Sequence, residues 1–243
     1  MELQDQRALV TGATSGIGRE TAKLLAREGA TVLVTGRNPS GGAKTVADIE
    51  AAGGRASFIA ADMADVDAVR RLAAEVGEVD VLVNNAAIFP FAPTVEQDVP
   101  DFDAMFDVNV RAPYFLTAAL VPKMVAKGSG SIINVTTIAA AVGMPDSSVY
   151  GASKAALESL TRTWAAEFSG SGVRVNNVSP GPVHTEKVLA QDGDLVEKLG
   201  TMTQLGRTAA PVEIAEVILF LASPRSSYLT GTTITADGGA IAV

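Results

Sequence analysis

Residues 7–38 alternate two apolar strand patterns with one helical pattern, and this short unit restricts the fold more than any other part of the chain. The patterns predict a strand over residues 7–10, a helix over 17–28 that Gly29 ends, and a second strand over 31–35. Two strands joined in this way by a helix form a βαβ unit, which belongs to a parallel sheet.

Three glycines fill the turn between the first strand and the helix, at Gly12, Gly16 and Gly18. In such a turn, backbone N–H groups and the positive end of the helix can face a pyrophosphate, and we expect side chains at these positions to obstruct its approach. The spacing G-x-x-x-G-x-G is wider than the common dinucleotide fingerprint. Its place directly after a strand and at the start of a helix nevertheless predicts a dinucleotide site.

The end of the second strand indicates which dinucleotide is bound. An acidic residue that binds the adenosine ribose hydroxyls of NAD is expected there, but the sequence has Gly36 followed by Arg37. A guanidinium group suits a 2′-phosphate by charge and by geometry, so Arg37 favours NADP(H) over NAD(H). The alternative is that Arg37 is a solvated turn residue.

The same alternation continues along the chain. It predicts strands over residues 55–62, 79–86 and 131–137, and helices over 65–76 and 98–126. The strands are almost continuously apolar, which is typical of a parallel sheet with helices on both faces. We therefore expect an α/β fold, a doubly wound parallel sheet of the Rossmann type. No linker or repeat interrupts the pattern, so residues 1–243 are expected to form a single domain.

Ligands of such sheets bind at the carboxyl ends of the strands. Polar residues collect at these predicted ends: Asp62, Asn84, Asn85, Thr136, Thr137 and Ser179.

A tyrosine and a lysine stand four residues apart at the start of an alanine-rich helical pattern, in "YGASK". On a helix, Tyr150 and Lys154 would lie on one face, one turn apart. A nearby ammonium group favours the phenolate, so we expect Lys154 to lower the pKa of Tyr150 and make it a proton donor. The alternative is an ordinary surface pair on an amphipathic helix.

Composition excludes several other classes of function. The chain has no cysteine and one histidine, His184, which excludes thiolate catalysis and metal sites built from cysteine or clustered histidine, so no metal is expected. A net charge of -8 argues against nucleic acid or an anionic membrane as a partner. The N-terminus lacks the pattern of a secretory signal, and no long apolar run is present, so we expect a cytoplasmic protein.

Further motifs join these residues. They are "NNAA" at 84–87, Asn109 in "DVNV", "YGASK", "VRVNNVSPG" at 173–181 and "DGG" at 237–239. In this order and spacing, over residues 11–239, the chain resembles the short-chain dehydrogenase/reductase family. The resemblance implies a catalytic tetrad of Asn109, Tyr150, Lys154 and a serine, whose position here is occupied by Thr137.

The resemblance also implies the role of each tetrad residue. Tyr150 exchanges a proton with the carbonyl or alcohol oxygen, and Lys154 lowers its pKa and holds the ribose of the nicotinamide half. Thr137 donates a hydrogen bond to the same oxygen, and Asn109 maintains the helix geometry and a water that feeds Lys154. Threonine keeps the hydroxyl but is β-branched, so its direction is open, and Ser147 or Ser148 could replace it.

The residues of the turn and the resemblance together give a candidate cofactor site. It comprises Gly12, Thr14, Ser15, Gly16, Ile17, Gly18, Arg37, Asp62, Met63, Asn84, Ala86, Tyr150, Lys154, Pro180, Gly181, Val183 and Thr185. His184 stands between two of these positions, and we assign it no catalytic role.

The resemblance places a loop and helix over the substrate at about residues 186–207. Around the predicted site lie mainly apolar residues without an arginine clamp: Ile88, Phe89, Phe91, Val142, Met144 and Leu189. This set favours a small or medium apolar ketone, aldehyde or secondary alcohol as the substrate.

Two alternatives remain open. A 3-oxoacyl-[acyl-carrier-protein] reductase shares several motifs, but it would need a basic surface for an acidic carrier, and "FSGSGVR" offers a single arginine. A non-catalytic NADP(H)-binding sensor or partner-binding protein would keep the fold without turnover, and Thr137 is its only support.

The helical patterns at 103–120 and 155–168 carry more apolar surface than one face of a sheet can cover. The resemblance implies that these helices pair between subunits, so we expect a homotetramer with two-fold axes.

Overall fold

The computed structural model describes residues 1–186 and 195–242. Its core is a seven-stranded sheet in the order β3-β2-β1-β4-β5-β6-β7, in which every pair of neighbours is parallel. The strands are β1 (Arg7–Thr11), β2 (Thr31–Gly36), β3 (Arg55–Ala60), β4 (Val81–Asn84), β5 (Gly130–Val135), β6 (Val173–Pro180) and β7 (Thr233–Ala236). The expected doubly wound Rossmann fold is confirmed.

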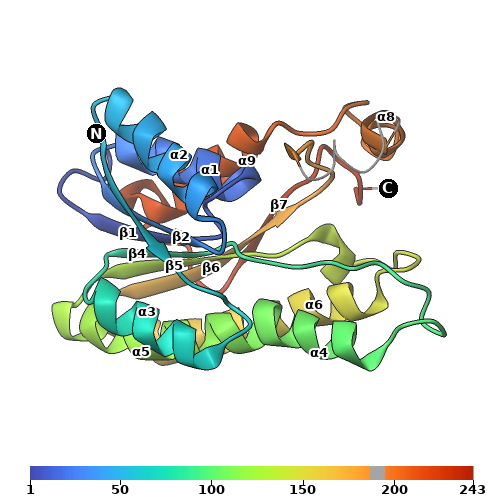
Figure 1. The fold of residues 1–243 in the computed structure, drawn as a ribbon, viewed down its shortest axis with the longest axis horizontal. Coiled ribbons are helices and arrows are strands. Elements are labelled where there is room, and N and C mark those ends of the chain that lie inside the picture. The colour runs from blue at the N-terminus through green and yellow to red at the C-terminus, as the bar shows by residue number, and fades with distance from the viewer. Residues whose placement is uncertain (187–194, 243) are drawn as a thin grey trace.

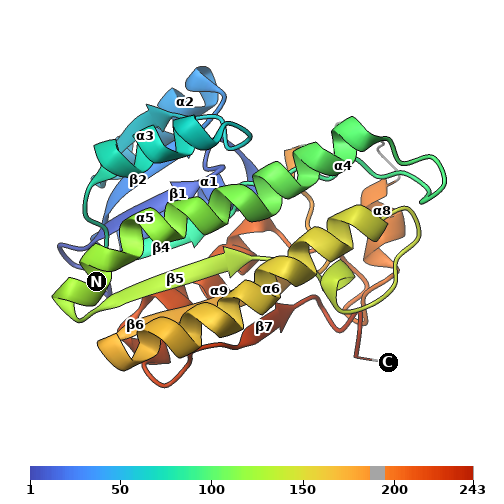
Figure 2. The same cartoon turned by 90° about the horizontal axis from the view of Figure 1, so that it is seen from below.

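Helices cover both faces of this sheet, as Figure 1 shows. On one face lie α1 (Gly16–Arg27), α2 (Pro39–Ala51) and α9 (Pro211–Ala222). On the other lie α3 (Val66–Val76), α5 (Ala112–Lys127) and α6 (Ser148–Phe168), seen from below in Figure 2. A short helix, α8 (Leu195–Gly200), lies near the C-terminus in Figure 1.

The two layers of helices explain why the strands are apolar at consecutive positions. Along β1, Ala8 and Val10 pack into the core beneath α1 and α9, whereas Leu9 between them packs into the core above α3 and α5. Ile132 and Ile133 of β5 divide between the two cores in the same way. Successive strand residues point to opposite faces, so a strand covered on both sides must be apolar throughout.

The predicted boundaries hold to within a few residues, with one larger difference. The region 98–126, expected as one helix, is α4 (Val99–Phe106), a π-helical turn (Asp107–Arg111) and α5. The predicted strand 131–137 ends at Val135, so Thr136 and Thr137 lie just past the carboxyl end of β5. Asp65 caps the start of α3, where its side chain accepts a hydrogen bond from the N–H of Asp67.

Strand order determines where a ligand can bind. The chain runs from β1 outward to β3 and then returns to β4 on the other side of β1, so the connections leave β1 and β4 in opposite directions. The crevice at the carboxyl ends of these two strands is the expected ligand site of such a sheet.

None of the described helices is long and apolar enough to cross a membrane. The cytoplasmic location stays a prediction.

Candidate active site

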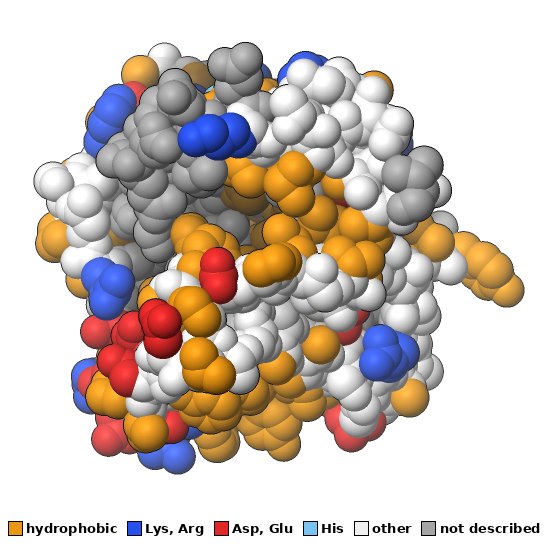
Figure 3. All heavy atoms as spheres, turned by 90° about the vertical axis from the view of Figure 1, so that its right-hand side faces the viewer, with side chains coloured by type: hydrophobic (Ala, Val, Ile, Leu, Met, Phe, Trp, Pro, Cys, Tyr) orange, Lys and Arg blue, Asp and Glu red, His pale blue; other side chains and the backbone are white. Residues whose placement is uncertain are grey.

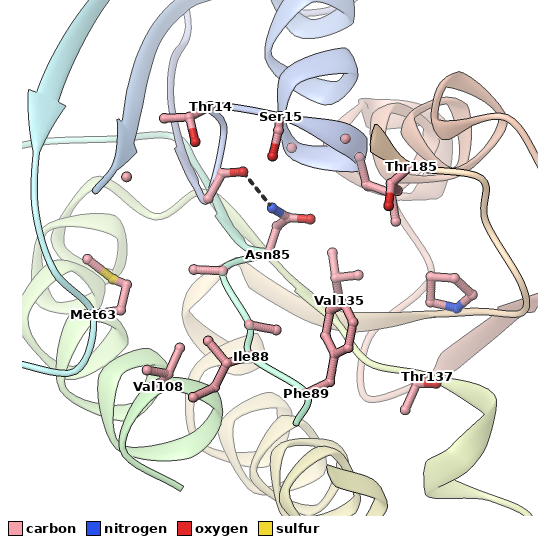
Figure 4. Close-up of a pocket in the computed structure, with 18 of the residues that line it drawn as sticks. Thr14, Ser15, Met63, Asn85, Ile88, Phe89, Val108, Val135, Thr137 and Thr185 are labelled. Atoms are coloured by element: carbon pink, nitrogen blue, oxygen red, sulfur yellow. Dashed lines mark hydrogen bonds between the residues drawn. The ribbon is translucent and has the colours of Figure 1, made fainter. Parts of the chain in front are cut away.

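A cavity of about 520 Å³ lies at the carboxyl ends of the strands. Side chains that line it come from the turn after β1, the ends of β2 and β3, the segment after β4, the end of β5, α6 and the segment after β6 (Figure 4). Of the predicted site residues, those lining the cavity are Gly12, Thr14, Ser15, Gly16, Ile17, Gly18, Arg37, Asp62, Met63, Ala86, Thr137, Tyr150, Lys154, Pro180, Gly181, Val183 and Thr185.

The glycine turn is shaped by contacts within the protein. Gly12 has a φ of +66°, and a Cβ there would lie 2.9 Å from the Cα of Ala86. A Cβ on Gly18 would lie 2.5 Å from the carbonyl oxygen of Gly12 and from Nδ2 of Asn85. Both glycines are therefore required by close packing of the turn against the segment after β4. Obstruction of a ligand, which we expected as the reason, is not needed to explain them.

The N-terminus of α1 opens onto the cavity through Ser15, Gly16, Ile17 and Gly18. Ser15 occupies the N-cap position, and its side chain makes no capping hydrogen bond. The first N–H groups of α1 thus remain available to an anion, and the positive end of the helix dipole favours one. This arrangement fits the pyrophosphate of a dinucleotide.

Two charged side chains border the cavity at the ends of β2 and β3. Arg37 is exposed and has no ion-pair partner among the residues that the structure describes. Asp62 is also exposed, and its Oδ1 accepts a hydrogen bond of 3.0 Å from the N–H of Ala64. A guanidinium group held at the cavity edge can bind a phosphate.

Asn84 is not among the residues that line the cavity, and its neighbour Asn85 lines it instead. Asn84 is 2% exposed, and its amide donates to Oδ1 of Asn134 on β5 at 2.8 Å. Asn85 turns the other way, so its amide donates to the carbonyl oxygens of Thr11, at 2.8 Å, and Gly12, at 3.3 Å (Figure 4). Consecutive residues at a strand end point to opposite sides, which exchanges the two roles.

Lys154 is 1% exposed, and its Nζ donates a hydrogen bond of 2.7 Å to the carbonyl oxygen of Val135 at the end of β5. Burial lowers the pKa of Lys154 to about 8 and raises the pKa of Tyr150 to about 12. Our expectation that Lys154 lowers the tyrosine pKa is therefore wrong, because the pKa of Tyr150 is raised. The ammonium is directed at Val135, and loss of solvent around the phenol outweighs every other influence on its pKa.

Thr137 supplies the hydroxyl that the sequence left open. It lines the cavity together with Tyr150, and its hydroxyl works against the burial that raises the pKa of Tyr150. Its Oγ1 also accepts from the N–H of Ala139 at 3.3 Å, which fixes its direction. Ser147 and Ser148 are engaged elsewhere, with the carbonyl oxygen of Pro145 and with Thr94.

Asn109 lies in the π-helical turn, is fully buried and does not line the cavity. It accepts from the N–H of Ile88 at 3.0 Å and donates to the carbonyl oxygen of Ile88 at 2.9 Å and to Oγ of Ser153 at 3.1 Å. Ser153 in turn donates to the carbonyl oxygen of Tyr150 at 2.7 Å. Asn109 therefore ties the segment after β4 to the first turns of α6.

Several lining residues were not among the predicted cofactor or catalytic residues: Gly36, Asn38, Ala61, Asn85, Ala87, Ile88, Phe89, Val108, Val135 and Thr136. Five of these ten residues, Gly36, Ala61, Asn85, Val135 and Thr136, end a strand or directly follow one, which is the signal that could have identified them. Ile88 and Phe89 were expected on the substrate side. Val142 and Met144 do not line the cavity, and Leu189 lies outside the described residues. His184 does not line it either, and its Nδ1 lies 3.1 Å from Oγ1 of Thr208.

Comparison with known proteins agrees with this architecture. A family model described as enoyl-(acyl carrier protein) reductase matches residues 12–240. A solved structure described as a short chain dehydrogenase/reductase family protein is 57% identical, with a TM-score of 0.95 and complete coverage of both chains (100% each). The chain belongs to the short-chain dehydrogenase/reductase family. It is accordingly an oxidoreductase of this family.

Two further family members illustrate its range. The cis-4-hydroxycyclohexanecarboxylate dehydrogenase of Sinomonas cyclohexanicum is 40% identical over 241 residues, which cover 97% of this chain and 96% of the relative. The structure of a 3-oxoacyl (acyl-carrier-protein) reductase from Agrobacterium tumefaciens C58, with NADP bound, is 32% identical. Its TM-score is 0.93, and the match covers 97% of this chain and 94% of that one.

Proposed function

We propose that the protein is an NADP(H)-dependent oxidoreductase that interconverts a small or medium apolar ketone or aldehyde and its alcohol. The observation that carries this proposal is the pair of hydroxyl groups on Tyr150 and Thr137. Both side chains line a cavity that also contains the buried Lys154 and, at its other end, the glycine turn and the N-terminus of α1.

In this proposal, the N–H groups at the start of α1 and the side chain of Arg37 hold the phosphates of the cofactor. When bound, the nicotinamide supplies or accepts the hydride at the carbonyl carbon. Tyr150 gives its phenolic proton to the carbonyl oxygen during reduction and takes it back during oxidation. Because burial raises the pKa of Tyr150 to about 12, the phenol carries its proton at neutral pH, as reduction requires.

Thr137 donates a hydrogen bond to the same oxygen, where negative charge develops. Lys154 holds a positive charge beside the end of β5, where the charge stabilises a phenolate formed during turnover. Asn109 does not touch the reacting atoms in this scheme. It positions Tyr150 through Ser153 and positions the substrate side through Ile88.

The decisive experiment measures consumption of NADPH and NADH by the purified protein with a panel of apolar ketones and aldehydes. Turnover that prefers NADPH and is lost in Tyr150→Phe supports the proposal. If the wild-type protein binds NADPH tightly but turns over none of the panel, the proposed substrate class is wrong.

A second candidate function is reduction of 3-oxoacyl groups on an acyl-carrier protein, because a solved relative with NADP bound carries that description. The arginine that we considered for carrier docking, Arg174, is occupied within the protein. Its guanidinium donates to the carbonyl oxygens of Ser226, Leu221 and Ser223. A 3-oxoacyl thioester that reacts much faster on the carrier than as the free thioester would favour this alternative.

The non-catalytic sensor rested on Thr137 alone. The position of Thr137 argues against the sensor, because Thr137 lines the cavity with Tyr150 and keeps a hydroxyl where the family has a serine.

We also propose that the protein is a homotetramer built partly on α5 and α6. Tyr114 is 44% exposed and Phe115 is 37% exposed, and the ring of Tyr114 lies 6.1 Å from that of Trp164 on α6. An exposed aromatic group of this kind is typical of a surface that another subunit covers. Light scattering coupled to gel filtration tests this, and a monomer at micromolar concentration would contradict it.

A further inference from the structure

Three aromatic rings meet at the substrate side of the cavity. The ring centroids of Phe89 and Tyr150 are 5.8 Å apart, and those of Phe89 and Phe91 are 5.6 Å apart. Phe91 stands edge-on to Tyr150, with centroids 5.9 Å apart and an angle of 84° between the planes. Phe89 lines the cavity, whereas Phe91 lies outside its lining and is 54% exposed. Figure 4 labels Phe89, Val135 and Thr137 among the residues that line the cavity.

The segment that carries the two phenylalanines is held at both ends. Ile88, just before Phe89, is bound through its N–H and its carbonyl oxygen to the buried Asn109. Ala92, just after Phe91, donates a hydrogen bond of 3.0 Å to the carbonyl oxygen of Asp146. Asp146 has a φ of 62°, the left-handed region that few residues other than glycine adopt. The two rings are therefore positioned before any substrate arrives, which reduces the entropy lost on binding.

Among the described residues, few charged side chains line the cavity that holds Phe89 and Tyr150. Among the described residues that line the cavity, the charged ones are Arg37, Asp62 and Lys154. Arg37 and Asp62 belong to the ends of β2 and β3, and Lys154 is buried against Val135. Figure 3, which faces this edge of the molecule, shows hydrophobic side chains gathered around the central hollow. A neutral ring would be desolvated here against other rings, and edge-to-face contacts with them would add to the gain.

We propose that Phe89 and Phe91 form an aromatic wall that selects carbonyl substrates bearing an aromatic ring next to the carbonyl group. The wall lies beside Tyr150, so a ring attached to the reacting carbon reaches it directly. Aromatic pairs gain from edge-to-face and offset geometry beyond what apolar area alone provides. Phe91 presents its exposed ring for this contact. This inference rests on the proposed function, because it assumes that Tyr150 marks the position of the carbonyl.

The test compares acetophenone with cyclohexyl methyl ketone, which have similar size and differ in the aromatic character of the ring. We expect the wild-type kcat/KM to favour acetophenone. In Phe91→Leu, which keeps an apolar side chain but removes the ring, the ratio of the two kcat/KM values should fall roughly 2- to 10-fold. The kcat/KM for 2-butanone, which has no ring, should change much less.

Phe102→Leu is the matched control, because Phe102 is 44% exposed on α4 and stacks on Phe106 rather than on Tyr150. It should leave the ratio unchanged. Turnover of both ketones with a ratio that Phe91→Leu does not alter would overturn the aromatic wall while leaving the proposed function intact.

If neither ketone is turned over, binding gives the answer. Calorimetric dissociation constants of 1-phenylethanol and 1-cyclohexylethanol are then measured on the NADP-loaded protein and on NADP-loaded Phe91→Leu. A preference for the phenyl alcohol that is lost in the variant supports the wall even though the proposed function fails. Equal affinities in the wild-type protein overturn it.

Discussion

The end of the cavity beside α1 is built from backbone and small side chains, whereas the end beside α6 is built from aromatic and apolar side chains. At the first end, Gly12 and Gly18 pack so closely that a single added carbon would collide with the protein. Beside the second end, just outside the cavity lining, Phe91 is half exposed and can change without a collision. Close-packed backbone tolerates few substitutions, so the first end restricts the ligand to one kind of molecule, while the second can be adapted to different substrates.

The largest expected effect concerns Tyr150, where the two ends meet. Tyr150→Phe removes the proton donor but keeps the ring against Phe89 and Phe91, so substrate contacts remain. We expect kcat to fall about 10²- to 10⁴-fold, the range for loss of a general acid, while NADPH binding persists. Tyr114→Phe on α5 is the control and should retain activity. Equal loss of activity in both variants would remove Tyr150 from the mechanism.

The next effect is a pH dependence of stability caused by the buried Lys154. Its pKa is about 8 in the folded chain and 10.5 as its ordinary value, so between these pH values the unfolded chain binds the extra proton. The free energy of unfolding should therefore rise as pH increases from about 8 to 10, by at most about 3 kcal/mol for a fully buried group. The raised pKa of Tyr150, about 12, acts oppositely but only above about pH 10.

Urea unfolding at pH 7.5, 8.5 and 9.5 tests this with Lys154→Met as the comparison. The difference in unfolding free energy between the two proteins should move in favour of the wild-type chain as pH rises. A difference that stays constant over this range would show that Lys154 titrates as it does in water.

A smaller effect, on stability and on NADPH binding, is expected for a substitution in the glycine turn beside α1. In Gly18→Ala the new Cβ would lie 2.5 Å from the carbonyl oxygen of Gly12, so the turn must move. Overpacking of this kind costs about 1–3 kcal/mol of unfolding free energy and should also weaken NADPH binding. Gly170→Ala is the control, because a Cβ there meets nothing within 4 Å. Comparable losses in the two variants would contradict the difference between close-packed and open positions.

The sequence predicted the end of the cavity beside α1 better than the end beside α6, and the reason is physical. The order strand, glycine turn, helix, strand is encoded locally, so β1, α1 and β2 follow from residues close to each other in the chain. Asn84 and Asn85 were exchanged because strand boundaries leave the direction of a terminal side chain undetermined. The π-helical turn carries Asn109, whose hydrogen bonds to Ile88 and Ser153 join distant parts of the chain and are contained in no local pattern.

The pKa of Tyr150 was mispredicted for a related reason. Four-residue spacing on a helix identifies neighbours, but it does not say which of several partners a lysine chooses. Lys154 binds the carbonyl oxygen of Val135, 19 residues away in sequence, and the phenol is left to the effect of burial. The direction of the Thr137 hydroxyl was also open in the sequence. It is fixed by a hydrogen bond from the N–H of Ala139, which the sequence alone does not place.

The smallest expected effect tests whether Arg37, at the edge of the cavity, determines the preference for NADPH over NADH. Arg37 is exposed at the cavity edge and has no ion-pair partner among the described residues, so its charge is available to a 2′-phosphate. Arg37→Glu should weaken NADPH binding roughly 10-fold, since a charge-assisted hydrogen bond is replaced by repulsion, and should leave NADH binding unchanged or improved. Arg27→Glu makes the same charge change at the far end of α1 and controls for the long-range effect of net charge. Fluorescence titration of NADPH and NADH with the wild-type protein and both variants gives the six dissociation constants. If both variants weaken NADPH binding to the same extent, the preference for NADPH comes from the overall charge of the protein and not from Arg37 at the cavity edge.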